Sequence, residues 1–213
     1  MTSRLIDTRS SRSARLPAAG LVAAPLGWLA GWAIMRLGGS SGPNTGWDVA
    51  HALWIVSFVL FGAAAYALFR LLGGSPAARV ALAVALTGAA ALVVQMVIDL
   101  VVGLRTADKP AMVDLYDRVF AVPGVELVFF TVGPMLLFVG LLALVVLATV
   151  RRVAAPWQVL LVVAGIGLMV AGRPASGALR LLEGLGAACL WLALAPLARP
   201  AAPSSRPRRP GLD

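Results

Sequence analysis

Charged residues are scarce in this sequence. Only 13% of its 213 residues are Asp, Glu, Lys or Arg, whereas a soluble globular domain carries about 25%. Hydrophobic residues make up 60% and occur in long runs, without the periodicity of a half-buried strand or a surface helix. Apolar runs of about 18 or more residues are typical of membrane-spanning helices. The composition therefore argues against a water-soluble domain and predicts an integral membrane protein.

Residues that bind metals and prosthetic groups are scarce as well. The chain has one cysteine, Cys189, and one histidine, His51. A single cysteine forms no intrachain disulfide, and one histidine supplies neither the two axial ligands of a haem nor a three-histidine zinc site. The sequence also lacks a Walker A loop and a dinucleotide-binding fingerprint. We therefore expect no cofactor and no metal ion.

Basic residues outnumber acidic ones, and the formal net charge is +9. In a soluble protein this charge would suggest nucleic acid, but here the basic residues stand at the ends of apolar runs, where they set the orientation of membrane proteins. We expect no nucleic-acid partner and an attraction to anionic lipid headgroups. With a cytoplasmic N-terminus, twelve of the eighteen basic residues fall inside and six outside, which favours both termini in the cytoplasm.

Six apolar runs divide the chain. Backbone hydrogen bonding in lipid requires them to be helices, and at 1.5 Å per residue each spans ~30 Å except the short fifth run. The predicted fold is an all-α, polytopic bundle of about six transmembrane helices over residues 17–198. The individual runs are 16–37, 49–72, 78–104, 125–150, 156–171 and 175–198.

Three polar segments flank or interrupt the runs. Residues 1–16 form a basic cytoplasmic tail that we expect to be disordered, and residues 199–213 form a second, proline-rich basic tail in the cytoplasm. The longest loop, 105–124, has Asp108 at a helix-capping position, with Met112 and Tyr116 on one apolar face. It predicts a short amphipathic helix at the outer interface, and an ordinary structured loop is the alternative.

Small residues, a proline and tryptophans mark the runs further. Gly27 and Gly31 form a GxxxG pattern, which allows helices to approach closely and here favours packing within the chain over a dimer contact. Pro134 should kink the fourth run, because it removes one backbone hydrogen bond. The tryptophans near the ends of the runs fit an aromatic belt at the two membrane interfaces: Trp47, Trp54 and Trp157.

Ionisable side chains inside the runs are the functional candidates, because each costs about 2.5–3.5 kcal/mol at a helix centre. In the proposed topology, all of them and one uncharged companion fall in the outer half of the bundle: Asp99, Gln95, His51, Glu126, Arg180 and Glu183. This one-sided distribution predicts a polar pocket that opens outward. Asp99 is the strongest candidate, since its short side chain reaches the interface poorly, and we expect Arg180 or His51 as its partner.

Other interpretations of these residues remain open. Side chains near the ends of a span reach the headgroups at little cost, and Arg180 could neutralise Glu183 within one helix, as Asp48 could pair with His51. A mixed metal site of His51, Asp99 and Glu126 has no support beyond similar depth.

Three functions fit these patterns. The first is an outward-facing pocket for a small solute, a lipid or a proton. The second is a structural or accessory subunit that binds another membrane protein through its small-residue faces. A membrane-embedded enzyme ranks last, since the acid–base groups lack a credible metal set.

The stretch from Asp99 to Met135, DLVVGLRTADKPAMVDLYDRVFAVPGVELVFFTVGPM, together with His51 at the start of the second run, is similar to uncharacterised six-span bacterial membrane proteins. The resemblance is one of architecture across most of the chain. It implies a multi-pass protein of the bacterial inner membrane, but it implies no activity and assigns no catalytic residue. The strong preference for arginine over lysine is typical of a GC-rich bacterial genome.

Overall fold

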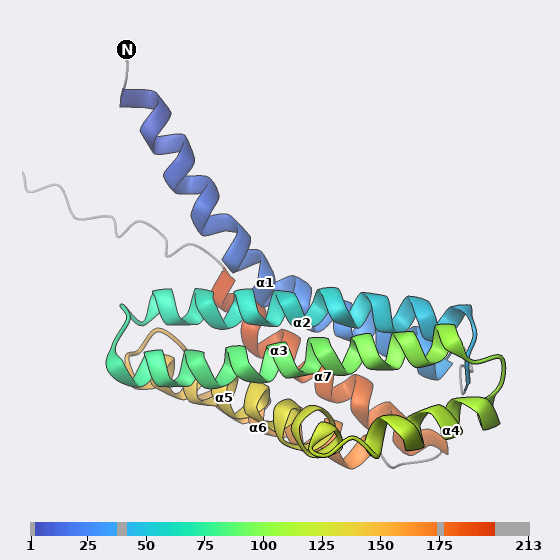
Figure 1. Cartoon of the computed structure of the whole chain (residues 1–213). Coiled ribbons are helices and arrows are strands. Elements are labelled where there is room, and N and C mark those ends of the chain that lie inside the picture. Colours follow the sequence, from blue (N-terminus) through green and yellow to red (C-terminus); the bar gives the residue numbers. More distant parts are fainter. Residues whose placement is uncertain (1–2, 38–41, 174–176, 199–213) are drawn as a thin grey trace, which may run out of the picture.

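The structure is a computed structural model that describes the backbone of residues 3–37, 42–173 and 177–198, and the side chains of 18–36, 42–173 and 178–198. All regular elements within these residues are helical, which confirms the predicted all-α fold class (Figure 1). In chain order they are α1 (Ser3–Leu37), α2 (Thr45–Leu71), α3 (Pro76–Arg105), α4 (Lys109–Phe120), η1 (Glu126–Val132), α5 (Gly133–Val150), α6 (Pro156–Gly172), η2 (Gly177–Arg180), α7 (Leu181–Leu194) and η3 (Ala195–Ala198).

Local sequence signals determine where the helices begin. The side chain of Asn44 accepts a hydrogen bond from the Trp47 amide at 3.0 Å and caps α2. Ser75 caps α3, which starts with a proline at its first position. Asp108 caps α4 by accepting from the Ala111 amide at 2.9 Å, as the sequence predicted.

Five of the helices are long and apolar enough to cross a membrane, so the chain has the architecture of a membrane-spanning helical bundle. The five segments are Ala18–Arg36, Thr45–Leu71, Pro76–Arg105, Glu126–Val150 and Ala178–Ala198. α6 is apolar but shorter, with 17 residues, or about 25 Å at 1.5 Å per residue. One expectation was wrong: residues 1–16 were expected to be disordered, but α1 already begins at Ser3, in a segment that contains several Arg and Leu residues, which are good helix formers.

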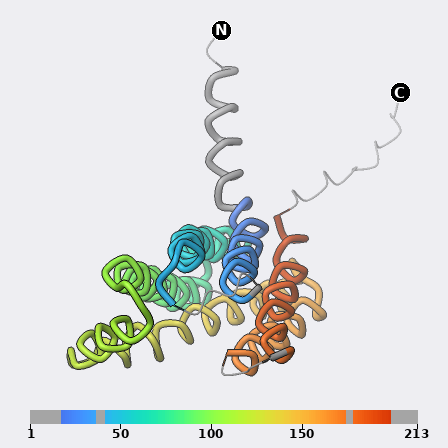
Figure 2. The backbone as a smooth tube through the Cα atoms, turned by 90° about the vertical axis from the view of Figure 1, so that its right-hand side faces the viewer, coloured from blue at the N-terminus to red at the C-terminus, as the bar shows by residue number. Residues whose placement is uncertain are grey.

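Six helices form a closed ring around a common centre. α1 contacts α2, α2 contacts α3, α3 contacts α5, α5 contacts α6, α6 contacts α7, and α7 returns to α1. The view along the bundle shows this ring with α4 beside α3 and outside the ring (Figure 2). α1 and α3 end, and α2 and α7 begin, at the end of the bundle that carries α4, which we call the α4 end.

Glycines let the helices of the ring approach closely. A Cβ on Gly88 of α3 would collide with the backbone of Leu137 in α5, and one on Gly140 of α5 would collide with Ala85. Gly31 of α1 lies against the ring of Trp54 in α2. The GxxxG pattern of α1 is therefore used within the chain, which weakens the argument for a partner subunit at this face.

The fourth span is irregular where Pro134 approaches the ring centre. Its first seven residues, Glu126–Val132, form a π-helix, and the amide of Gly133 donates to the carbonyl oxygen of Val128, five residues earlier. Because proline has no amide hydrogen to donate, the regular α-helical bonding begins only around this residue. Wide helical turns of this kind are frequent at functional sites, and Phe130 of this π-helix lines the outer hollow described below.

Candidate functional site

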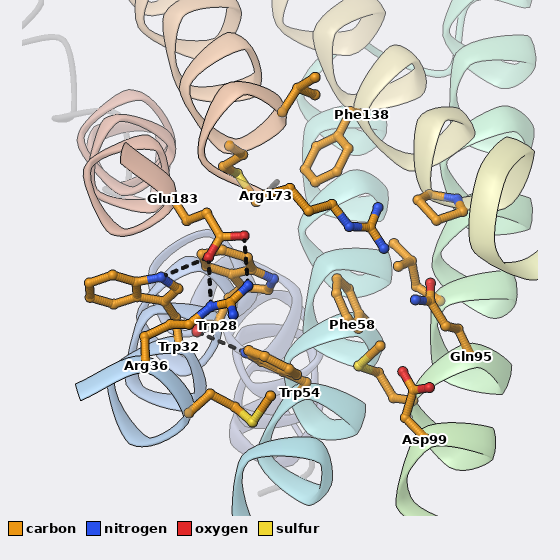
Figure 3. Close-up of a pocket in the computed structure, with 16 residues that line it drawn as sticks. Trp28, Trp32, Arg36, Trp54, Phe58, Gln95, Asp99, Phe138, Arg173 and Glu183 are labelled. Atoms are coloured by element: carbon orange, nitrogen blue, oxygen red, sulfur yellow. Dashed lines mark hydrogen bonds and ion pairs between the residues drawn. The ribbon is translucent and has the colours of Figure 1, made fainter. Parts of the chain in front are cut away.

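A partly enclosed cavity of about 240 Å³ lies inside the ring near the α4 end, and every helix of the ring contributes to its wall (Figure 3). One part of the wall is aromatic: Trp28 and Trp32 from α1, Trp54 and Phe58 from α2, and Phe138 from α5. The other part is polar: Arg36, Gln95, Asp99, Arg173 and Glu183. Such a mixture of an apolar lining and a few converging polar groups is the usual composition of a ligand-binding pocket.

An ion pair closes one side of this cavity. The Nε and Nη2 atoms of Arg36 lie 3.1 and 3.4 Å from the two carboxylate oxygens of Glu183. The indole Nε1 of Trp32 donates to the same carboxylate at 3.0 Å. The Glu183 side chain is 8% exposed and that of Arg36 is 30% exposed. Glu183 is thus neutralised and hydrogen-bonded within the protein, as a buried carboxylate in a membrane requires.

Asp99 on α3 is held by residues of two neighbouring elements, α2 and α4. The Tyr116 hydroxyl of α4 donates to Oδ1 at 2.6 Å, and the Nε2 of His51 lies 3.8 Å from Oδ2. His51 uses its other nitrogen, Nδ1, to donate to the carbonyl oxygen of Trp47 at 2.8 Å. The Trp47 indole in turn donates to the backbone oxygen of Asp99 at 2.9 Å. Oδ2 of Asp99 therefore has a histidine nearby but no hydrogen bond at 3.5 Å or less to it.

Gln95 lies one helical turn from Asp99 and also faces the cavity. The residue is 5% exposed, and its Oε1 atom is buried without a hydrogen-bond partner among the described residues. The guanidinium of Arg173, at the end of α6, points into the cavity toward Gln95 (Figure 3). A buried acceptor without a donor costs about 1–3 kcal/mol, so this amide is a natural contact for a bound molecule.

A second, more open hollow of about 480 Å³ lies between α4 and the ring. Trp47, Val113, Tyr116, Phe120 and Phe130 contribute to its wall. It shares three residues with the central cavity, and these form the partition between the two spaces: Gln95, Asp99 and Arg173. We call the outer hollow the vestibule.

The structure brings four of the six predicted polar residues together. Asp99, Gln95 and Glu183 line the cavity, and His51 lies against Asp99. Arg180 and Glu126 are exposed and do not line the cavity, because Arg180 lies in the short η2 segment and Glu126 at the start of the π-helix. The alternative pair of Asp48 and His51 does not form, because Nδ1 of His51 donates to the Trp47 carbonyl oxygen and Nε2 faces Asp99.

Arg36 and Arg173 are the residues that the sequence did not single out. Both look like ordinary topology signals, since each stands at the end of an apolar run. Only the folded ring shows that their side chains turn inward. The indoles of Trp47 and Trp54, which the sequence assigned to the aromatic belt, donate to the backbone oxygens of Asp99 and Trp28. Trp157 remains 46% exposed.

The acidic residues and the histidine do not form a metal site in the part of the chain that the structure describes. No three His, Cys, Asp or Glu side chains there are grouped closely enough to hold an ion. The mixed site of His51, Asp99 and Glu126 is therefore not assembled, because Glu126 does not share the wall that Asp99 lines.

Tyr116 should make the protein sensitive to strongly alkaline pH. Burial raises the pKa of the Tyr116 phenol, and the charge of Asp99 and the hydrogen bond to it raise this pKa further. The unfolded chain releases this proton near pH 10, while the folded protein retains it. The free energy of unfolding should then fall by about 1.4 kcal/mol per pH unit above about pH 10.

Unfolding measured at about pH 8 and about pH 11 checks this prediction. Tyr116→Phe should lose the alkaline slope, whereas the matched variant Tyr66→Phe, at the exposed second tyrosine, should retain it. An equal slope in wild type and Tyr116→Phe would contradict the assignment.

Comparison of the chain with protein families, with curated proteins and with solved structures found no match. The argument for function therefore depends on the geometry of the cavity alone.

Proposed function

We propose that this protein is a six-span protein of the bacterial inner membrane that binds a small solute in the central cavity of its helical ring. The solute enters this cavity from the extracytoplasmic side. The observation that carries the proposal is the cavity itself, whose wall combines five aromatic rings with five polar or charged side chains from all six helices. Charged side chains inside a membrane bundle are costly and usually mark the path of a substrate or ion.

The size of the cavity indicates the size of the solute. At ~30 Å³ for each water molecule, 240 Å³ holds about eight waters. This is slightly smaller than the 300–1,000 Å³ typical of pockets for drug-sized ligands. A solute with about as many non-hydrogen atoms as an amino acid is therefore a better match than a long lipid chain.

The distribution of basic residues supports the direction of entry. The helix ends opposite α4 lead into the connections and tails to which the sequence assigns twelve of the eighteen basic residues, so we take this side as the cytoplasmic one by the positive-inside rule. The α4 end then faces the extracytoplasmic side, with the vestibule leading toward the partition formed by Gln95, Asp99 and Arg173. In this orientation both termini lie in the cytoplasm.

Two neighbouring positions on α5 provide a sharp test. Phe138 lines the cavity, whereas Val139 is 58% exposed on the outer surface of the bundle, where lipid would cover it. In a Cys189→Ala background, which removes the single native thiol, Phe138→Cys should react with a charged, membrane-impermeant thiol reagent added outside. Val139→Cys should not, because a thiol in lipid stays protonated and dry.

Labelling of right-side-out vesicles followed by mass spectrometry measures both rates. We expect at least a tenfold difference, since the thiolate is the reactive species and forms only in a hydrated site. Denatured protein is the control, in which both cysteines must react. Equal protection of both positions in the folded protein would overturn the proposal of an outward-facing hydrated cavity.

A further inference from the structure

The central cavity contains one unsatisfied acceptor region and one unsatisfied cationic group. We infer, building on the proposed function, that its solute is a small zwitterion: a protonated primary amine binds at Asp99 and Gln95, and a carboxylate or phosphate binds at Arg173. The argument proceeds from the groups in the wall whose hydrogen-bonding capacity the protein does not use.

The acceptors lie on one face of α3. Within the described part of the chain, Gln95 Oε1 is buried without a partner, and Asp99 Oδ2 has no donor closer than the His51 nitrogen at 3.8 Å. These two acceptors are four residues apart, so they lie one above the other on the helix. A protonated amine has three N–H donors and one positive charge, and it can therefore satisfy both acceptors and balance the Asp99 carboxylate.

The cationic group comes from α6. Arg173 is an exposed residue that lines the cavity and the vestibule; its charge acts on Asp99 from beyond ion-pair distance, and the ion pairs among the described residues do not include it. Its guanidinium points toward Gln95 across the cavity (Figure 3). Arginine presents a fork of donors that fits a carboxylate or a phosphate in bidentate fashion. An anionic group on the same solute would complete this side of the site.

The other two charges of the central cavity's wall are paired with each other. Arg36 and Glu183 already neutralise each other, and Trp32 adds a third hydrogen bond to that pair. Asp99 and Arg173 then leave one negative and one positive charge facing the cavity. A simple cation would contact Asp99 alone and a simple anion would contact Arg173 alone, so each would use only one of the two charges. A zwitterion matches both.

Three molecules with the same branched hydrocarbon body separate these alternatives. Leucine carries both charges, 3-methylbutylamine carries only the amine, and 4-methylpentanoate carries only the carboxylate. Binding to the full chain in phosphatidylglycerol nanodiscs can be followed by titration calorimetry and by tryptophan fluorescence, because Trp28, Trp32 and Trp54 line the cavity. We expect leucine to bind at least about tenfold more tightly than either monofunctional compound.

Variants assign each end of the solute. Asp99→Asn and Gln95→Leu should weaken leucine binding by about 10- to 100-fold and about 10-fold, respectively, through loss of contacts to the ammonium group. Arg173→Met should weaken leucine binding by a similar factor as Asp99→Asn, yet leave the amine unaffected or bound more tightly. Asp114→Asn and Arg105→Met are matched controls, since both residues are exposed and neither lines the cavity, and both should bind leucine as the wild type does.

The zwitterion could be a free solute or the headgroup of a lipid such as phosphatidylethanolamine, whose ammonium and phosphate offer the same chemistry. Nanodiscs that contain phosphatidylethanolamine, compared with phosphatidylcholine, separate the two sources, because the choline nitrogen has no N–H donor. A fluorescence change with phosphatidylethanolamine, abolished by Asp99→Asn, together with no leucine binding, would assign the lipid headgroup and support the zwitterion.

The zwitterion is overturned if the amine or the carboxylate alone binds as tightly as leucine, if Arg173→Met has no effect, or if leucine and phosphatidylethanolamine both fail to bind. Labelling of Phe138→Cys distinguishes these failures from failure of the proposed function. A cavity that is labelled from outside but does not prefer a zwitterion still binds some other solute. If Phe138→Cys is not labelled from outside, both the hydrated cavity and the zwitterion site are contradicted.

Discussion

Replacement of Glu183 by leucine should lower the free energy of unfolding by about 3 kcal/mol. The change removes the acceptor for Trp32 Nε1 and leaves the guanidinium of Arg36 without its carboxylate partner. Breaking a fully buried pair costs about 3–5 kcal/mol. We expect the lower end of this range, because the Arg36 side chain is 30% exposed and can turn toward the α4 end of the bundle.

A double-mutant cycle separates the cost of the unpaired charge from the contribution of the pair. The double variant Arg36→Met/Glu183→Leu removes both charges, and it should recover at least 1 kcal/mol relative to Glu183→Leu, because apolar substitutes for buried pairs are often neutral or stabilising. Glu126→Leu is the control, since this exposed glutamate does not line the cavity. Unfolding by sodium dodecyl sulfate in mixed micelles gives the free energies of the wild type, the two single variants Arg36→Met and Glu183→Leu, the double variant and the control.

The same cycle tests how the ring is closed. Arg36 ends α1 and Glu183 begins α7, so their ion pair joins the first and last helices of the ring beside the cavity. If Glu183→Leu were as stable as the wild type, the pair would contribute nothing, and α1 and α7 would be held by apolar packing alone.

Replacement of Gly88 by alanine should destabilise the protein about as much as Glu183→Leu, although it adds only a single methyl group. The new Cβ would overlap the backbone of Leu136 and Leu137 in α5. Main-chain atoms cannot rotate away as a flexible side chain can, so α3 and α5 would have to separate. Overpacking costs about 1–3 kcal/mol, and we expect about 3 kcal/mol here because two backbones are in direct contact.

Gly167 in α6 is the matched control for this substitution. A Cβ there would meet nothing within 4 Å, and alanine should be neutral or stabilise the helix by up to about 1 kcal/mol. The opposite signs of Gly88→Ala and Gly167→Ala, measured by the same unfolding method, would show that close helix contact is responsible. Destabilisation of both variants to the same degree would instead indicate a general intolerance of alanine at these glycines.

Separation of α3 from α5 should also disturb the cavity. Gln95 and Asp99 lie two and three turns beyond Gly88 on α3, and Pro134 and Phe138 flank Leu137 on α5. The helix contact at Gly88 therefore sets the distance between the acceptors and the aromatic wall. Sites that must hold a small solute depend on such support from packed, rigid elements.

Much of the architecture follows from the sequence alone. The long apolar runs determine the all-helical bundle, because a backbone in lipid must satisfy its own hydrogen bonds. Asp108 and the apolar face that contains Met112 and Tyr116 suffice to place α4. The scarcity of ionisable side chains in the runs also draws attention to Asp99, His51 and Glu183, since each such residue in a span needs a partner or a role.

Only the tertiary structure decided which residues meet. Glu183 pairs with Arg36, 147 positions away, and not with Arg180 three positions away, because the η2 segment leaves Arg180 exposed while the start of α7 turns Glu183 toward α1. The same holds for Arg173 and for Tyr116, whose contact with Asp99 depends on how α4 folds back against α3. Sequence spacing predicts neighbours on one helix, but the closure of a ring of six helices determines which faces point inward.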